Sequence, residues 1–483
     1  MNREFLVNII FLVVINLLIK PFYIFGIDRT IQNVVADGDY GMYFTLFSFT
    51  YLFQIINDFG IQNFNNRNIS QSRHLIDKYF PNILVLKTLM GLVFLVVVFI
   101  VAAILKFEAV WNNLLFLVAL NWILTSFLLY LRSNVSALGM YRVDSMLSVL
   151  DKLLLIIICG VLLWSPLTGG VFEIEWFALA QTFSLGATGM VAFAIAYKKL
   201  KWFKWSFKPV FWLLIFKQSY PYALIIFLMT AYTRLDGVMI ERMLPDGRFE
   251  ADIYASAYRL LDAANMFGYL FASLLLPMFS RLLKEQKSIQ ELTRTGFSLI
   301  WTGAVTLAIS VWFFREEIMH LLYDNVTAES GPVLGYLIIS FIAVSGGYIF
   351  GTLLTANGNL KGMNIIFVFG LVLNFTLNWF FIPEYFAEGA AVATCITQFF
   401  VFILQLVLAV KLLDLSFPRR ELLALAGFTI AFMLLASVVE SYVPGNWVVK
   451  FLLCASIGMV LAFLFRVLNM RHFVELLKRT DSQ

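Results

Sequence analysis

Apolar runs of about 20 residues recur along the whole chain, and the polar connections between them are all short. A helix needs about 20 residues to cross the ~30 Å hydrocarbon core of a bilayer. Hydrophobic residues make up 61% of the chain and charged residues 13%, against about 25% charged in a soluble domain. The sequence therefore predicts an all-α polytopic membrane protein with 14 transmembrane helices and no soluble domain. The expected spans are 5–27, 40–60, 82–105, 110–139, 146–165, 175–197, 212–243, 252–280, 294–314, 332–356, 362–382, 388–411, 421–440 and 447–466.

Lysine and arginine are distributed unequally over the connections. With the N-terminus in the cytoplasm, the inward ends carry 22 of the 35 basic residues and the outward connections carry six. Acidic stretches such as "DGD" at 37–39 and "EIE" at 173–175 lie in outward connections. The positive-inside rule then predicts that both termini are cytoplasmic. The net charge of +5 reflects this topology and does not indicate a nucleic-acid partner.

The cysteines, the histidines and the N-terminal segment do not indicate a functional site. Cys159, Cys395 and Cys454 lie in separate apolar runs and are expected to be small buried hydrophobes. The three histidines fall in or beside polar connections, so no metal site is expected. The N-terminal apolar run lacks a following small-residue cleavage site, which favours a retained first helix over a signal peptide.

Seven basic residues lie within the expected spans, and three of them have a simple explanation. Lys87, Lys152 and Lys217 lie within about two turns of a predicted cytoplasmic helix end. Long lysine side chains in such positions reach water while their stems stay apolar. These three lysines are therefore interpreted as snorkelling residues.

The other four basic residues, Lys20, Arg132, Arg234 and Arg259, lie deeper in the spans. A charge at the centre of a membrane helix costs roughly 2.5–3.5 kcal/mol. These side chains are therefore predicted to line an interior cavity. They outnumber the acidic groups in the same spans, which favours an anionic ligand, and a structural salt-bridge network is the alternative.

Two carboxylates accompany the arginines of the seventh and eighth spans. Arg234 and Asp236 are two residues apart, so they point to nearly opposite sides of one helix and cannot pair. Arg259 and Asp262 are three residues apart and share a helix face. Asp236 and Arg259 lie at similar depths from the outer helix ends, which predicts an ion pair between them.

Three stretches of the sequence carry a family resemblance. They are "DYGMYFTLFSFTYLFQIINDFGIQNFNNRNIS" (39–70), the pair "QSYPYALIIFLMTAYTRLDGVMIERML" (218–244) and "IYASAYRLLDAANMFGYLFASLLLPMFSRL" (253–282), and "NFTLNWFFIPEYFAEGAAVATCITQ" (374–398). Together they resemble the bacterial O-antigen and capsule type of polysaccharide-repeat flippases. That family belongs to the multidrug/oligosaccharidyl-lipid/polysaccharide exporter superfamily.

The resemblance implies two six-helix lobes around a central cavity. The N-lobe would comprise 1–197 and the C-lobe 212–411, joined by the basic cytoplasmic linker 198–211. Residues 412–483 would add two helices and a basic cytoplasmic tail. The implied activity is alternating-access transport of an undecaprenyl-diphosphate-linked oligosaccharide to the outer leaflet of the inner membrane, for surface polysaccharide synthesis.

The resemblance also assigns residues and partners. The family's R-L-D motif falls on Arg234 and Asp236, and its A-Y-R-L-L motif places Arg259 in the cavity. Arg234 and Arg259 would contact the substrate, with Lys20 and Arg132 as helpers that lie in no comparable motif. Asp236 and Asp262 would support the arginines or couple transport to H⁺ or Na⁺. No cofactor is expected, and the expected partners are the lipid-linked substrate, membrane lipids and polysaccharide assembly proteins such as a polymerase, with a monomer as the default state.

Three other functions are alternatives to this one. A lipid-linked peptidoglycan-precursor flippase would carry the same diphosphate. A multidrug or cation exporter would need acidic groups in the N-lobe cavity, where the sequence offers Lys20 and Arg132 instead. A membrane enzyme is disfavoured because no outer loop is long enough to hold sugars, and the chain has no G-x-x-x-x-G-K-[ST] phosphate-binding motif.

Overall fold

The computed structural model describes residues 15–16, 18–62, 65, 69, 73–165, 171–200 and 208–468, which form helices and connections without any strand. Residues 5–14 of the first expected span, most of the expected linker and the basic tail after 468 lie outside the described residues. Contacts divide the chain into an N-terminal unit that ends at Glu241 and a C-terminal unit that begins at Arg242. The lobe boundaries expected from the sequence stay a prediction.

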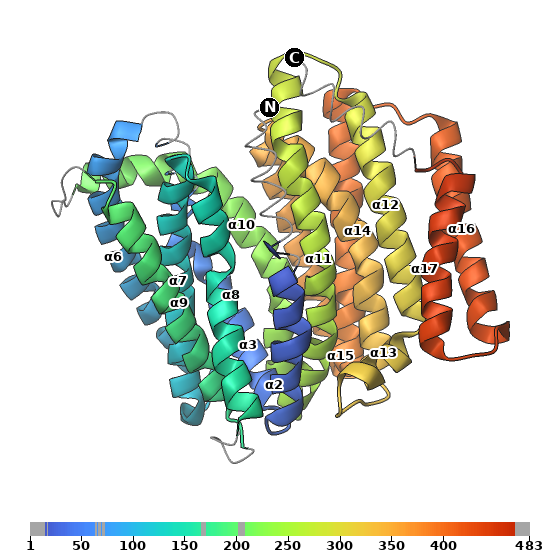
Figure 1. The fold of residues 1–483 in the computed structure, drawn as a ribbon, viewed down its shortest axis with the longest axis horizontal. Coiled ribbons are helices and arrows are strands. Elements are labelled where there is room, and N and C mark those ends of the chain that lie inside the picture. The colour runs from blue at the N-terminus through green and yellow to red at the C-terminus, as the bar shows by residue number, and fades with distance from the viewer. Residues whose placement is uncertain are drawn as a thin grey trace. The chain divides into compact units, whose positions relative to one another are not determined.

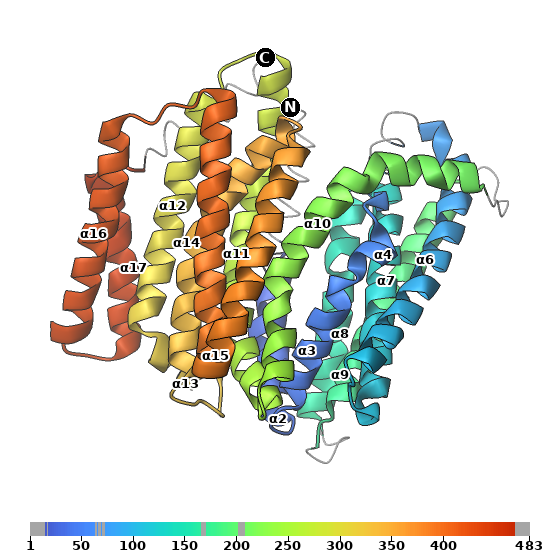
Figure 2. The ribbon, with the colours of Figure 1, turned by 180° about the vertical axis from the view of Figure 1, so that it is seen from behind.

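The helices of the N-terminal unit are mostly long and apolar. α7 packs against α8 and α9, α3 packs against α7 and α9, and α4 packs against α6. α10 curves along its length, and Pro221 lies inside it (Figure 2). The elements are η1 (Tyr23–Asp28, a π-helix), α2 (Arg29–Val34), α3 (Asp39–Leu52), α4 (Gln54–Asp58), η2 (Arg73–Leu75), α6 (Ile76–Ile104), η3 (Ala109–Trp111), α7 (Asn112–Ala137), α8 (Tyr141–Trp164), α9 (Ile174–Tyr197) and α10 (Pro209–Met243).

The C-terminal unit is built around α14, which packs against α11, α12, α13 and α15. α16 and α17 pair with each other and lie beside α12 (Figure 1). Phe428 and Phe432 of α16 and Cys454 of α17 are buried in that contact. The elements are α11 (Gly247–Lys284), α12 (Gln290–Phe313), α13 (Arg315–Leu322), α14 (Ser330–Ala356), α15 (Leu360–Leu413), α16 (Arg419–Tyr442) and α17 (Trp447–Leu464).

The long helix α15 contains a sharp break. Phe386 has φ +50° and ψ −134°, and the two arms of α15 correspond to the eleventh and twelfth expected spans. Gly389 lets the arms meet, because a Cβ there would lie 2.4 Å from the Phe381 carbonyl oxygen. Glu250 of α11 caps the second arm by accepting a hydrogen bond from the Ala387 amide at 3.2 Å. The expected boundary between these two spans is therefore confirmed.

The apolar surface of the helices requires a lipid environment. On α6, Leu92, Val96 and Ile100 recur at four-residue spacing and are each more than half exposed, whereas Phe94 and Val98 are buried on the opposite face. A continuous exposed apolar face of this kind is unfavourable in water and favourable in hydrocarbon. Among the described residues, ten helices are long and apolar enough to cross a bilayer. The chain is a multi-pass membrane protein.

The expected number of 14 spans stays a prediction, because the first expected span lies partly outside the described residues and three others are not counted separately. α15 counts once although its two arms each have the length of a span. The second expected span is interrupted at Phe53, which separates α3 from α4. α11 contains the eighth expected span but is not among the ten helices counted in the described residues.

Candidate functional site

Arg234 is placed by a close contact between α10 and α3 in the N-terminal unit. Gly237 of α10 lies against α3 so closely that a Cβ there would be 2.8 Å from the Phe44 ring. The Thr45 hydroxyl donates a hydrogen bond to the Gly237 carbonyl oxygen at 3.2 Å. Helix residues three apart share a face, so this contact also brings Arg234 next to α3. A glycine in the sequence thus sets the position of the arginine.

The Arg234 guanidinium lies over an aromatic surface. Its central carbon is 5.8 Å from the ring centroid of Phe47 and 5.9 Å from that of Tyr51, one turn further along α3. Cation–π contacts contribute about 0.5–2 kcal/mol each. Arg234 is half-buried. Its guanidinium therefore contacts aromatic rings within its own unit.

We call Phe47, Tyr51 and Trp122 the aromatic shelf. Tyr51 stacks on Trp122 of α7 with ring centroids 4.3 Å apart and planes inclined by 7°, and the Phe47 and Trp122 centroids are 4.9 Å apart. All three side chains are partly exposed. The Trp122 indole nitrogen is buried, and within the described part of the chain it makes no hydrogen bond. The shelf thus places flat aromatic faces beside the Arg234 guanidinium.

Polar residues hold the helices behind the shelf together. The Asn121 side-chain amide donates to the Ala178 carbonyl oxygen at 3.0 Å, and Thr182 donates to Asn121 at 2.7 Å. Gln181 donates to the Tyr43 hydroxyl at 2.8 Å. These bonds connect α7, α9 and α3. Asn121 and Gln181 therefore act as interhelical hydrogen-bonding residues.

A second basic group forms where the first expected span meets α7 and α8. Lys20 lies within electrostatic range of Lys152, Asp151 and Arg132. Arg132 is bound to Asp144 with Nε 2.8 Å from Oδ1, and Lys152 lies 3.6 Å from Asp151. The structure therefore brings together Lys20 and Arg132, and adds Lys152, which the sequence analysis interpreted as a snorkelling residue and did not place in the cavity. Three cations share this region with two carboxylates.

In the C-terminal unit, Arg259 and Asp262 lie on one face of α11. The Arg259 Nη1 atom is 3.9 Å from Asp262 Oδ2, and both side chains are mostly buried. The expectation that this pair shares a helix face is confirmed. Asp236 is fully buried in the N-terminal unit, and its pairing with Arg259 stays a prediction because the two residues belong to different units.

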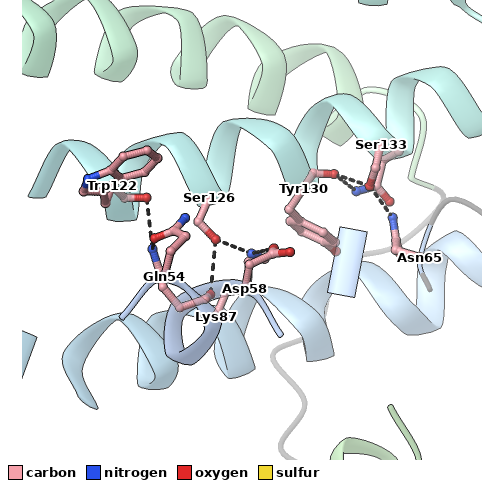
Figure 3. Close-up of polar contacts among 10 residues, drawn as sticks. Gln54, Asp58, Asn65, Lys87, Trp122, Ser126, Tyr130 and Ser133 are labelled. Atoms are coloured by element: carbon pink, nitrogen blue, oxygen red, sulfur yellow. Dashed lines mark hydrogen bonds and ion pairs between the residues drawn. The ribbon is translucent and has the colours of Figure 1, made fainter. Parts of the chain in front are cut away.

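The interpretation of Lys87 as a snorkelling residue is wrong. Its side chain is 1% exposed, and Nζ lies 2.6 Å from Asp58 Oδ1 and also contacts the Ser126 hydroxyl (Figure 3). The error arises from the helix boundary. α6 begins at Ile76, six residues earlier than expected, so Lys87 lies about 16 Å along the helix at 1.5 Å per residue. A lysine three turns into a packed helix cannot reach the helix end.

Sequence reasoning missed two features of the N-terminal unit. The shelf residues Phe47 and Tyr51 are four apart, and this spacing is a usable signal for aromatic side chains on one helix face. Asp58 lies in the D-F-G segment, but its distance in sequence from Lys87 gave no reason to pair them. Within the described ranges, no group of three or more histidine, cysteine or carboxylate side chains has the geometry of a metal site.

Comparison with known families identifies the chain. The family model described as "Polysaccharide biosynthesis protein" matches residues 5–283, which is more than half of the chain. The chain belongs to this family. The capsular polysaccharide biosynthesis protein CapF of Staphylococcus aureus is 26% identical to this chain over 191 residues. That match covers 38% of this chain and about half, 47%, of the length of CapF.

Solved structures show that this member of the polysaccharide biosynthesis family has the fold of the flippase and exporter superfamily. The lipid II flippase MurJ in an inward closed conformation matches with a TM-score of 0.74 at 14% identity, covering 95% of this chain and 100% of MurJ. An inward-facing multidrug resistance MATE transporter matches with a TM-score of 0.59 at 11% identity, covering 81% and 94% of the two chains. Identities this low establish the fold alone. The expected resemblance to the superfamily is confirmed.

Proposed function

We propose that this protein is a flippase for an undecaprenyl-diphosphate-linked oligosaccharide, which it moves from the cytoplasmic to the outer leaflet of the bacterial inner membrane. Membership of a polysaccharide biosynthesis family supports a role in building a surface polymer. The transporter fold supports movement of a substrate across the membrane rather than catalysis of a reaction. The proposal includes 14 spans, cytoplasmic termini and two lobes that alternate around a central cavity.

One observation carries the choice of substrate: Arg234 is held over the aromatic shelf. A guanidinium binds diphosphate oxygens through charge-assisted, often bidentate hydrogen bonds. Aromatic faces beside it suit the apolar faces of sugar rings. A lipid-linked sugar diphosphate presents both groups next to each other, which matches the arrangement of Arg234, Tyr51 and Trp122.

The other charged residues have supporting roles in this proposal. Lys20 and Arg132, with Lys152, attract the anionic head of the substrate to the N-terminal unit. Arg259 contacts the substrate from the C-terminal unit, with Asp262 fixing its orientation. Asp236 and Asp262 are the carboxylates through which H⁺ or Na⁺ would couple to transport.

The alternative with specific support is a flippase for a lipid-linked peptidoglycan precursor, because the lipid II flippase MurJ matches nearly the whole chain in fold. The MATE neighbours support a drug exporter in the same way. Both alternatives share the fold. They differ from the proposal in the head group that Arg234 and the aromatic shelf would recognise.

The test is deletion of the gene in its host, with measurement of lipid-linked oligosaccharide in the inner membrane and of surface polysaccharide. We expect the lipid intermediate to accumulate and the surface polymer to disappear. Wild type restores both, whereas Arg234→Ala reduces transport by at least tenfold, since a charge-assisted hydrogen bond contributes about 1.5–3 kcal/mol. Arg234→Lys is expected to retain part of the activity because it keeps the charge and loses the bidentate geometry.

The control variant is Arg142→Ala, which removes an exposed arginine outside the candidate site. Full activity of Arg234→Ala at normal membrane levels would remove Arg234 from the site. Unchanged oligosaccharide intermediates with depleted outer-leaflet peptidoglycan precursor would replace the proposal with the first alternative. Hypersensitivity to cationic drugs with normal polysaccharide would replace it with the second.

A further inference from the structure

A polar pocket lies in the C-terminal unit where α12 and α16 begin and α17 ends. Its volume is about 350 Å³. Three arginines line it, one from each of these helices or its end: Arg294, Arg420 and Arg466. Among the described residues that line the pocket, Glu421 is the one acidic residue, and hydroxyl groups come from Thr295 and Ser298. The pocket is therefore cationic, and it joins α12 to the last two helices.

One of the three arginines is rigidly held. Arg294 donates to the carbonyl oxygen of Ser416 through Nε at 2.7 Å and to its hydroxyl through Nη2 at 2.9 Å. The Ser416 amide in turn donates to the Gln290 side chain at 3.0 Å. These bonds fasten the connection between α15 and α16 to the start of α12. The Arg294 guanidinium is thus preorganised beside the pocket, and Glu421 lies 3.7 Å from its Nε.

A second arginine occupies an unusual backbone position. Arg466 has φ +56°, immediately after the end of α17. The Val467 amide donates to the Ala462 carbonyl oxygen at 3.0 Å, which is the bond that closes a helix end of the Schellman type. Glycine is usual at this left-handed position because it has no Cβ. Lys106 and Gln286 take the same position at the ends of α6 and α11, and at the end of α17 it is an arginine whose side chain lines the pocket.

An apolar groove adjoins the polar pocket. It has a volume of about 430 Å³ and lies between α12, α15 and α16. Leu425 lines both cavities, so the charged compartment and the apolar compartment meet at this residue. Most of the groove is aromatic or aliphatic. Its lining includes Phe297, Trp301, Phe402, Phe417 and Leu422.

We infer that this paired cavity binds an anionic phospholipid, with its phosphate among Arg294, Arg420 and Arg466 and one acyl chain along the groove beyond Leu425. Charge distribution predicts that this end of the unit faces the cytoplasm, where anionic lipids attract basic side chains. Arginine guanidinium groups bind phosphate oxygens through bidentate hydrogen bonds.

The remaining polar groups favour a phospholipid over a lipid diphosphate. Glu421 repels a second negative charge but accepts hydrogen bonds from the hydroxyls of a glycerol head group. Thr295 and Ser298 add hydroxyl groups that bond either the phosphate or the glycerol. The inference does not depend on the proposed transport activity, since its residues are separate from Arg234 and the aromatic shelf.

The test uses the full-length purified protein in detergent and phosphatidylglycerol with brominated acyl chains. Bromine quenches tryptophan fluorescence at short range, and Trp301 lines the groove. We expect saturable quenching of a fluorescence component that is absent in Trp301→Phe. The double variant Arg420→Gln/Arg466→Gln is expected to weaken the apparent affinity at least tenfold. Both arginines are exposed, so their replacement leaves the packing intact.

The matched control is Lys284→Gln/Lys361→Gln, which removes the same charge from exposed positions outside the pocket. A change of less than twofold in this control supports a specific site. If both double variants lose the same amount of affinity for phosphatidylglycerol, the binding is a general attraction to surface charge, and the inference is overturned. Equal quenching by brominated phosphatidylcholine would also overturn it. Displacement of phosphatidylglycerol by a lower concentration of a polyprenyl diphosphate would assign the cavity to that lipid instead.

Discussion

Removal of one partner of the Lys87–Asp58 ion pair is expected to destabilise the N-terminal unit strongly. The two charges are 2.6 Å apart, and their side chains are 1% and 13% exposed. Ser126 contacts the lysine and donates to the Asn57 carbonyl oxygen at 3.2 Å, which completes the network shown in Figure 3. Breaking a buried pair leaves an uncompensated charge and costs about 3–5 kcal/mol. Lys87→Met should therefore shift the unfolding equilibrium by at least 100-fold.

The double variant Lys87→Met/Asp58→Asn isolates the interaction energy of the ion pair from the other effects of each substitution. It leaves no lone charge, so its loss of stability should be smaller than that of either single variant. The measurement is a double-mutant cycle in which the free energy of unfolding is obtained from titration of the purified protein with a denaturing detergent. We expect a coupling energy of at least 2 kcal/mol, on the order found for residues in one buried network.

Arg281 and Glu285 provide the matched control. They form an ion pair at 2.9 Å on α11, and their side chains are 38% and 35% exposed. Exposed pairs contribute about 0–1 kcal/mol, so the same cycle on this pair should give a coupling near zero. Equal coupling energies for the two pairs would refute the argument that burial sets the strength of the Lys87–Asp58 interaction.

Three further outcomes are expected. Gly389→Ala should lower the melting temperature, because the added Cβ would clash with the Phe381 carbonyl oxygen. The control is Gly186→Ala on α9, where no atom lies within 4 Å of the added Cβ. This control should leave the melting temperature unchanged or raise it slightly. Burial and the neighbouring carboxylates raise the pKa of Glu250 to about 7, so its contribution to stability falls as pH rises from about 4.5 through 7. Glu250→Gln should therefore match wild type in thermal unfolding at pH 5 and exceed it at pH 8. Trp122→Ala, which removes half of the stacked pair in the aromatic shelf, should reduce transport without reducing membrane levels, and normal transport would exclude the shelf from substrate binding.

Local sequence patterns were sufficient for the helices and for some of the site. Apolar length predicted the bounds of helices such as α9 and α14 to within about two residues. The three-residue spacing of Arg259 and Asp262 placed them on one face, because helix geometry alone sets that relation. The break near Phe386 was also expected from the chain, since polar residues and Pro383 interrupt the apolar run there.

The sequence by itself determined that this chain crosses a membrane as helices, because span length and hydropathy depend only on neighbouring residues. The tertiary structure alone decided which charges meet. Lys87 pairs with Asp58, and Arg132 pairs with Asp144, because separate helices pack against each other. No local sequence pattern predicts these pairs. The free-energy cost of a charge within a membrane helix made Arg234 a candidate site residue. Its position over Phe47 and Tyr51, however, depends on how closely α10 approaches α3. Local spacing sets the faces of a helix, and only packing sets what each face touches.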